Sequence, residues 1–325
     1  MARASSHRLR LAVVLAPIVL ATACKPNLGS PPSLIEGPRI LAVRGTPAEA
    51  GEGAMVTYDV LVVNQMGRIA NPTVQWALCH DPKPPASANA VANSCVTAPD
   101  DTMMPSATFT APMPSGDCKV FGPQPPEVMA GKPPLRPQDP DVTGGFYQPV
   151  RAKLLDGADS FLAFALERLQ CPLANAPQNI TAMFNMMIKP NQNPAIASVT
   201  LDPSGTATPL FTMNQATAPT FAPVAPGAPV KLEVAWTAAT PETYPVYNLV
   251  TQKVDTHRES LSVSWFATDG SFEHDRTGRG EDETDLTTDN VWTAPATPGL
   301  VHVWLLLRDI RGGVDFAETA LMVGP

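Results

Sequence analysis

Hydrophobic and polar residues alternate with a period of two over several stretches of the chain, a pattern typical of half-buried β-strands. The clearest stretch lies near the C-terminus, where one face of a predicted strand carries Val301, Val303, Leu305 and Leu307. The glycines of the following residues 309–313 can adopt the positive φ that a tight turn requires. A second strand over residues 314–323 then completes a predicted C-terminal β-hairpin.

Residues 37–79 and residues 193–268 contain the same succession of elements. Each segment begins with a short strand, continues through a turn that contains glycine into a long alternating strand, and reaches a strand with a tryptophan, Trp76 or Trp265. The inward face of the long strands carries Val56, Tyr58, Val60 and Val62 in the first copy and Val230, Leu232, Val234 and Trp236 in the second. Two copies of one β-module are the economical explanation.

A tryptophan strand, a late hairpin and about seven short strands per module resemble an immunoglobulin-like or PKD-like sandwich. The predicted fold is therefore all-β, with two immunoglobulin-like β-sandwich domains in tandem, over residues 37–190 and 191–325. The first domain is expected to end with three strands, over residues 147–154, 159–171 and 180–189.

The chain has 37 prolines among its 325 residues, and proline is excluded from helix interiors and central strands. Short strands joined by long proline-rich loops fit this composition. The longest such region is residues 80–144, a predicted insertion in the first domain. A connection of this length is either an inserted functional loop or poorly ordered surface.

Residues 1–23 have the three parts of a secretory signal peptide: a basic head, an apolar run and small residues before a cleavage point. The apolar run is too short to span a bilayer, which needs roughly 20 apolar residues. The segment from Leu20 to Cys24 resembles the bacterial lipobox, in which the cysteine is diacylated and becomes the mature N-terminus. Ala21 stands where leucine is usual, so a cleaved product without lipid remains an alternative.

Lipid on Cys24 would place two acyl chains in a bilayer, which suffices for anchorage because each buried methylene contributes ~0.8 kcal/mol. Lys25 follows the cysteine in place of aspartate, which by resemblance to the enteric sorting rule favours the outer membrane. We therefore expect an exported lipoprotein of the cell envelope at the outer membrane, facing the periplasm or the cell surface. Residues 24–36 would form its tether.

Four cysteines remain after Cys24, an even number that indicates two disulfides in an oxidising compartment. Three pairings are possible. We favour Cys79 with Cys95 and Cys118 with Cys171, because the first pair would close a compact proline-rich loop. A zinc site that includes His80 is the alternative, but no two cysteines have the C-x-x-C spacing that presents two thiolates to one metal.

The formal net charge of −8 makes nucleic acid and anionic lipid headgroups poor partners. The chain also lacks a Gly-x-Ser-x-Gly elbow, a His-Glu-x-x-His helix and a phosphate-cradling glycine loop. We therefore predict no catalytic residues, no cofactor and a non-enzymatic role.

Residues 269–289 are rich in carboxylates, which could furnish the oxygen ligands of a calcium ion. The segment lacks EF-hand spacing, so a solvated acidic loop is the favoured interpretation. The weak calcium candidates are Asp269, Glu273, Asp275, Asp285 and Asp289.

Met183, Met186 and Met187 offer thioethers, which suit Cu(I). On the strand predicted over residues 180–189, Met186 would lie on one face and the other two on the opposite face. The three sulfurs would then not converge, and the pattern favours packing or an interface.

Four short segments resemble those of a group of myxobacterial lipoproteins: PRILAVR at residues 38–44, WALC at 76–79, GGFYQPV at 144–150 and WFATDGSF at 265–272. The resemblance implies a cell-envelope lipoprotein of unknown function with immunoglobulin-like or PKD-like sandwiches, and it carries over no functional residue.

Two hypotheses follow. In the first, the protein is a non-enzymatic structural or interaction module that is held at the membrane by Cys24 and displays residues 80–144 to an envelope protein or glycan. In the second, it binds a small ligand or calcium through residues 269–289.

Overall fold

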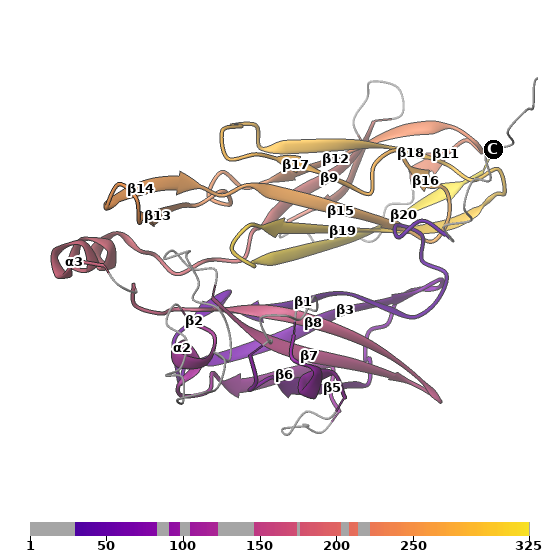
Figure 1. Cartoon of the computed structure of the whole chain (residues 1–325). Coiled ribbons are helices and arrows are strands. Elements are labelled where there is room, and N and C mark those ends of the chain that lie inside the picture. The colour runs from indigo at the N-terminus through magenta and orange to yellow at the C-terminus, as the bar shows by residue number, and fades with distance from the viewer. Residues whose placement is uncertain are drawn as a thin grey trace, which may run out of the picture. The chain divides into compact units, whose positions relative to one another are not determined.

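A computed structural model describes residues 30–82, 91–97, 105–122, 146–173, 176–202, 208–213 and 222–324 (Figure 1). The predicted signal peptide and Cys24 lie outside these residues, as do residues 83–90, 98–104 and 123–145 of the predicted insertion. The chain from Pro32 onward forms one compact unit. Within the described residues, no helix combines the length and the apolar character needed to cross a membrane.

The N-terminal half of this unit is a sandwich of two four-stranded sheets, called sandwich 1 below. In one sheet β1, β3 and β4 are neighbours and β6 also pairs with β3; the other sheet has the order β2-β8-β7-β5. The strands are β1 (Arg39–Thr46), β2 (Glu49–Ala50), β3 (Met55–Asn64), β4 (Gly67–Arg68), β5 (Val74–Leu78), β6 (Thr108–Pro112), β7 (Tyr147–Asp156) and β8 (Asp159–Leu169).

The C-terminal half is a sandwich of two five-stranded sheets, called sandwich 2, with the orders β10-β9-β12-β18-β16 and β11-β20-β19-β15-β17. A separate hairpin is formed by β13 and β14. The strands are β9 (Ile196–Asp202), β10 (Thr208–Thr212), β11 (Ala222–Val224), β12 (Pro229–Trp236), β13 (Thr243–Asn248), β14 (Lys253–Arg258), β15 (Leu261–Ala267), β16 (Ser271–Phe272), β17 (Arg276–Arg279), β18 (Thr287–Thr293), β19 (Gly299–Asp309) and β20 (Val314–Val323).

The two sandwiches share one strand order, and it is the immunoglobulin-like order. In sandwich 1 the first strand and β6 both flank β3, as β9 and β18 flank β12 in sandwich 2. On the opposite sheets β5-β7-β8 corresponds to β15-β19-β20, and each of these sheets gains a short parallel strand at its last member, β2 or β11. The predicted all-β fold of two immunoglobulin-like sandwiches in tandem is therefore confirmed.

A tryptophan lies at the centre of each core, as the repeat predicts. Trp76 has no exposed surface, and its ring lies 5.9 Å from that of Phe109 and 6.4 Å from that of Tyr58. Its Nε1 donates to the Ser106 carbonyl at 3.0 Å. Trp265 is equally buried, and its Nε1 donates to Thr277 Oγ1 at 2.9 Å. Both indoles thus satisfy their one polar atom, which burial requires.

A third hydrophobic cluster joins the two sandwiches. Leu61 and Val63 of β3 pack there with Trp304 and Leu306 of β19, and all four are fully buried. Neighbouring residues of β3 and β19 face the cores of their own sandwiches, so each strand is buried on both faces. Double burial explains why residues 60–63 and 303–307 read as uninterrupted apolar runs rather than as an alternation.

The end of the predicted tether belongs to the fold. Ile35 is 1% exposed in the cluster between the sandwiches, and its amide donates to the Ala267 carbonyl at 2.9 Å. In return, the Ala267 amide donates to the Ser33 carbonyl at 2.9 Å. Residues 33–35 therefore run beside β15 instead of forming a free linker.

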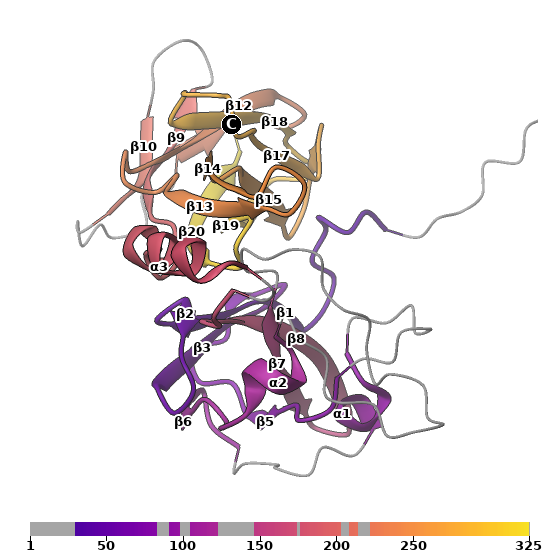
Figure 2. The same ribbon diagram turned by 60° about the vertical axis from the view of Figure 1, so that its left-hand side comes forward.

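Two predicted elements differ from the structure. Residues 180–189 are not a strand, because Gln178–Met187 forms helix α3, which packs on the β13–β14 hairpin (Figures 1 and 2). Part of the predicted insertion, residues 80–144, is not a loop. Strand β6 pairs with β3 in sandwich 1, and helices α1 (Asn93–Thr97) and α2 (Asp117–Val120) come before and after it in the chain.

Candidate functional site

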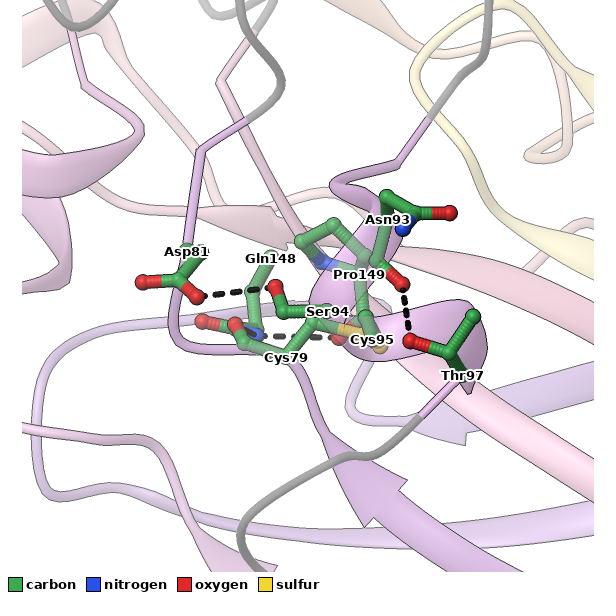
Figure 3. Close-up of a disulfide and its surroundings, with 8 residues drawn as sticks. All are labelled: Cys79, Asp81, Asn93, Ser94, Cys95, Thr97, Gln148 and Pro149. Carbon is green, nitrogen blue, oxygen red and sulfur yellow. Dashed lines mark hydrogen bonds between the residues drawn. A yellow bond between two sulfur atoms is a disulfide. The ribbon is translucent and has the colours of Figure 1, made fainter.

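The first candidate is the surface formed by the described parts of residues 80–144, which disulfides fasten to sandwich 1. The bond between Cys79 and Cys95 connects the end of β5 to α1, with 5.4 Å between the Cα atoms (Figure 3). Gln148 Nε2 donates to the Cys79 carbonyl, and Ser94 Oγ donates to Asp81 Oδ2 at 2.8 Å. Helix α1 is thereby held against the edge of the β5–β7 sheet.

The second disulfide connects Cys118 in α2 to Cys171, just after β8, with 5.7 Å between the Cα atoms. The Cys118 amide also donates to Glu52 Oε1 at 3.1 Å. Next to this bond Asp117 is 3% exposed, and burial raises the pKa of its carboxyl to about 7. The structure therefore contains both disulfides in the pairing that the sequence favoured.

The disulfides close loops of 16 and 53 residues, which corresponds to ~3 and ~4 kcal/mol of unfolded-state chain entropy respectively. Both are in sandwich 1, and both fasten the connection between β5 and β7 rather than joining the two sheets across the core. We name this surface the stapled surface: α1, α2 and their two disulfides.

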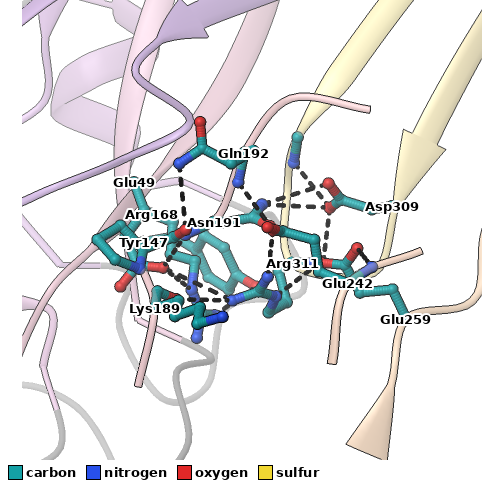
Figure 4. A network of polar contacts seen from close by, with 12 residues as sticks. Glu49, Tyr147, Arg168, Lys189, Asn191, Gln192, Glu242, Glu259, Asp309 and Arg311 are labelled. Atoms are coloured by element: carbon teal, nitrogen blue, oxygen red, sulfur yellow. Dashed lines mark hydrogen bonds and ion pairs between the residues drawn. The ribbon is translucent and has the colours of Figure 1, made fainter. Parts of the chain in front are cut away.

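The second candidate is a buried polar network between the sandwiches, centred on Arg311 in the β19–β20 turn (Figure 4). The Arg311 side chain is 4% exposed. Its Nη2 lies 2.7 Å from Glu242 Oε2 and its Nε 2.7 Å from Glu259 Oε1. Across the interface Glu49 Oε2 pairs with Arg168 Nε at 3.0 Å and lies 3.9 Å from Arg311 Nη1.

The same network holds the linker between the sandwiches. The Asn191 amide donates to Glu49 Oε2 at 2.8 Å, and its Nδ2 donates to Asp309 Oδ2 at 3.3 Å. Asp309 Oδ1 accepts from the amides of Arg311 at 2.9 Å and Gly313 at 2.8 Å. Burial raises the pKa of Glu259 to about 7, and the nearby Asp309 carboxylate adds to this effect. Arg311 acts in the opposite direction and lowers the pKa of Glu259. Every residue of this network has a protein partner. The network therefore connects the two sandwiches, and we call it the joint.

A cavity of about 260 Å³ is the third candidate, and sequence reasoning missed it. Apolar residues of β1 and β8 line it together with Glu167, Asn193 and Arg308. Glu167 is 4% exposed, its Oε1 makes no hydrogen bond to a described residue, and burial raises the pKa of its carboxyl to about 8, with nearby Glu49 adding to the effect. Gly45 lies against this carboxyl: a Cβ there would be 2.0 Å from Glu167 Oε2, so a larger residue would displace the Glu167 side chain.

The structure does not bring the weak calcium candidates together. Among the described residues no three His, Cys, Asp or Glu side chains are placed to hold a metal ion. Asp269 Oδ1 accepts a hydrogen bond from the Gly270 amide. Asp285 Oδ2 lies 3.8 Å from Arg279 Nε, and Asp289 Oδ1 lies 3.6 Å from Lys231 Nζ. All five carboxylates, Asp269, Glu273, Asp275, Asp285 and Asp289, are exposed.

The methionines behave differently from the sequence prediction. In α3 the residues Met183, Met186 and Met187 are spaced i, i+3 and i+4, so they share one helix face. The expectation that their sulfurs point to opposite faces was wrong, because it rested on a strand. Their exposed fractions are 37%, 81% and 41%.

No protein-family model matches the chain. No curated protein sequence matches it either. Among solved structures, a chimeric titin Z1Z2-Z1Z2 tandem carrying a GRGDS peptide from fibronectin matches at 10% identity over 89% of this chain and 100% of that one, with a TM-score of 0.22. Domains 4 and 5 of the S-layer protein SbsC match at 8% identity over 88% and 100%, with a TM-score of 0.20.

The C-terminal domain of the Streptococcus pyogenes antigen I/II-family protein AspA matches at 8% identity, over 89% of this chain and 100% of that one, with a TM-score of 0.23. Scores this low carry no argument about function. The immunoglobulin-like assignment rests on the strand order of the two sandwiches.

Proposed function

We propose that the protein is a non-enzymatic structural or interaction module of the cell envelope, held at a membrane by lipid on Cys24. It presents the stapled surface to an envelope protein or glycan. The observation that carries this proposal is the placement of the disulfides, which fasten α1 and α2 to sandwich 1 and do not join its two sheets to each other. Fastening the two helices in this way holds their exposed side chains in place, and preorganisation lowers the entropic cost of binding.

The junction between the sandwiches supports the same function. A buried polar network and an apolar cluster join two sandwiches that are covalently continuous through residues 190–193. The N-terminal segment is fastened as well, at Ser33 and Ile35. Eight residues lie between Cys24 and Ser33, so a lipid on Cys24 would keep Ser33 within ~30 Å of the membrane, the reach of a fully extended chain of this length.

Fractionation tests the anchor. The full-length chain is expected in the membrane fraction of the producing cell, and the Cys24→Ala chain in the soluble fraction, because the variant has no thiol to acylate. A variant with Cys118→Ser and Cys171→Ser keeps Cys24 and serves as the control for cysteine loss. Membrane retention of the Cys24→Ala chain would exclude the lipid anchor.

Photo-crosslinking tests the stapled surface. A photoreactive phenylalanine at Asn93, exposed in α1, should insert into the C–H bonds of a bound protein or glycan in intact cells. The matched control places the same group at Val250, which is 94% exposed on the β13–β14 hairpin turn. A crosslinked product from position 93 alone, lost when Cys79 and Cys95 are both serine, is the expected result. Equal products from both positions, or none, would contradict the proposed role.

A further inference from the structure

Helix α3 carries a dense group of exposed thioethers. Its ten residues, QNITAMFNMM, include no charged side chain, and Phe184 is the one that is buried among them. Phe184 lies on the side that packs on β13 and β14. At 100° per residue, Met183, Met186 and Met187 fall within an arc of about 100°. All three methionines are exposed, Met186 at 81% and the other two at 37% and 41%, so this face is not the one that buries Phe184.

The spacing brings the three side chains within reach of one another. Side chains three and four apart on a helix have Cβ atoms about 5–6 Å apart. Methionine is unbranched and has three rotatable side-chain bonds, so each sulfur can be turned toward a common point over the helix surface. Three flexible arms on consecutive turns can therefore enclose one ion, which the alternating faces of a strand would prevent.

The donor set selects the ion. Thioether sulfur is a soft, neutral ligand that prefers Cu(I), whereas Ca²⁺ and Mg²⁺ require oxygen ligands and structural Zn²⁺ takes thiolate or imidazole. The helix provides no carboxylate, thiolate or imidazole of its own. A hard or borderline divalent ion would thus find no suitable ligand in α3, while a monovalent soft ion would find three.

We infer that Met183, Met186 and Met187 form a binding site for one Cu(I) ion on the exposed face of α3. The ion replaces weakly held water ligands with three sulfur atoms, and no electron transfer is involved. The site is independent of the membrane anchor and of the stapled surface, since it lies on a different element.

Competition for Cu(I) tests the site on the mature chain. The protein is titrated into the Cu(I) complex of bicinchoninate in ascorbate, and the loss of the coloured complex measures transfer of the ion. One equivalent of Cu(I) per chain is expected for the wild type. Replacement of Met183, Met186 and Met187 by leucine should remove this binding, with at least about a tenfold loss for each single variant, since even outer-shell changes cost that much at a metal site.

Two exposed methionines outside α3 serve as the control. Met55 and Met66 are 56% and 86% exposed, and their replacement by leucine should leave the stoichiometry and affinity unchanged. Leucine is as good a helix former as methionine, so the α3 variants should retain their circular dichroism and melting temperature.

NMR distinguishes coordination by these three methionines from nonspecific metal binding. In protein labelled with ¹³C at the methionine methyl groups, three of the signals should shift together as Cu(I) is added. The signals that shift should be those absent from the three leucine variants. Failure of the wild type to take Cu(I) from bicinchoninate, or equal binding by the triple variant, would overturn the inference.

Discussion

The buried carboxyl of Glu167 makes stability depend on pH in a direction opposite to that of a salt-bridged acid. Burial raises the pKa of this group from its ordinary 4.5 to about 8. Between these values the folded chain holds a proton that the unfolded chain has released. The free energy of unfolding therefore falls as pH rises through this window, by ~1.4 kcal/mol per pH unit. Below pH 4.5 both states are protonated and the penalty disappears.

Glu167→Gln removes the ionisable group while keeping its size. The variant should gain stability over the wild type on going from pH 5 to pH 8, by on the order of 4 kcal/mol from the per-unit slope. Urea unfolding followed by tryptophan fluorescence, with the disulfides intact, measures the difference at each pH. Asp117 and Glu259 also have raised pKa values, but they are present in both proteins and cancel in the comparison.

Glu36→Gln, at an exposed position of the same chain, is the control and should show no pH-dependent difference. An equal difference between Glu167→Gln and the wild type at pH 5 and pH 8 would refute the reasoning. Such a result would mean that Glu167 is charged at neutral pH and has a partner within the cavity.

Further variants test the polar network around Arg311, the N-terminal segment and the disulfides. Arg311→Ala should lower the free energy of unfolding by ~3–5 kcal/mol, because it leaves buried carboxylates without their cation; urea unfolding measures this, and a loss below 1 kcal/mol would contradict the assigned role. Ile35→Ala should cost ~2–5 kcal/mol by opening a void between the sandwiches, and an unchanged urea midpoint would show that the segment is not packed there. Serine at both Cys79 and Cys95 should cost ~3 kcal/mol and increase proteolysis near α1, which mass spectrometry of limited digests can locate.

Local patterns predicted those elements in which one face is buried. The hairpin of β19 and β20, the two tryptophan strands and the repeat all follow from a period of two, which depends on neighbouring residues only. The disulfide pairing followed from sequence proximity, because a 16-residue loop closes more readily than a longer one. Such features require no knowledge of the other sandwich.

The misassignment of α3 has a specific cause. Ile180, Phe184 and Ile188 are four residues apart, and this spacing is compatible with one face of a helix and also with one face of a strand. Periodicity therefore could not decide, and the β-rich context favoured the wrong answer. The structure resolves the ambiguity through Phe184, which is buried alone on a helix. The error also changed the predicted metal chemistry, because the assumed strand separated the methionine sulfurs that the helix places on one face.

The cavity and the network could not be predicted for a different reason. Their members come from β2, β8, the linker and the β19–β20 turn, up to 262 positions apart between Glu49 and Arg311. A sequence signal for Glu167 does exist, because this carboxylate directly follows the apolar run of residues 161–166 and precedes the paired Arg168. A lone charge of this kind is usually assigned to a solvent-facing position, and only the pairing of β8 with its neighbours places it inside.

The apolar runs in β3 and β19 contain the information that would have united the two modules. A strand of a solvent-facing antiparallel sheet alternates, whereas residues 60–63 and 303–307 do not. Since one face of each strand fills its own sandwich, the second apolar face requires another partner. Two such strands in one chain, one per module, satisfy each other, as Leu61, Val63, Trp304 and Leu306 do. The pattern therefore predicts a fixed junction between modules. A polar residue at any of these positions should weaken this junction without entering either sandwich core, and urea unfolding measures the loss of stability.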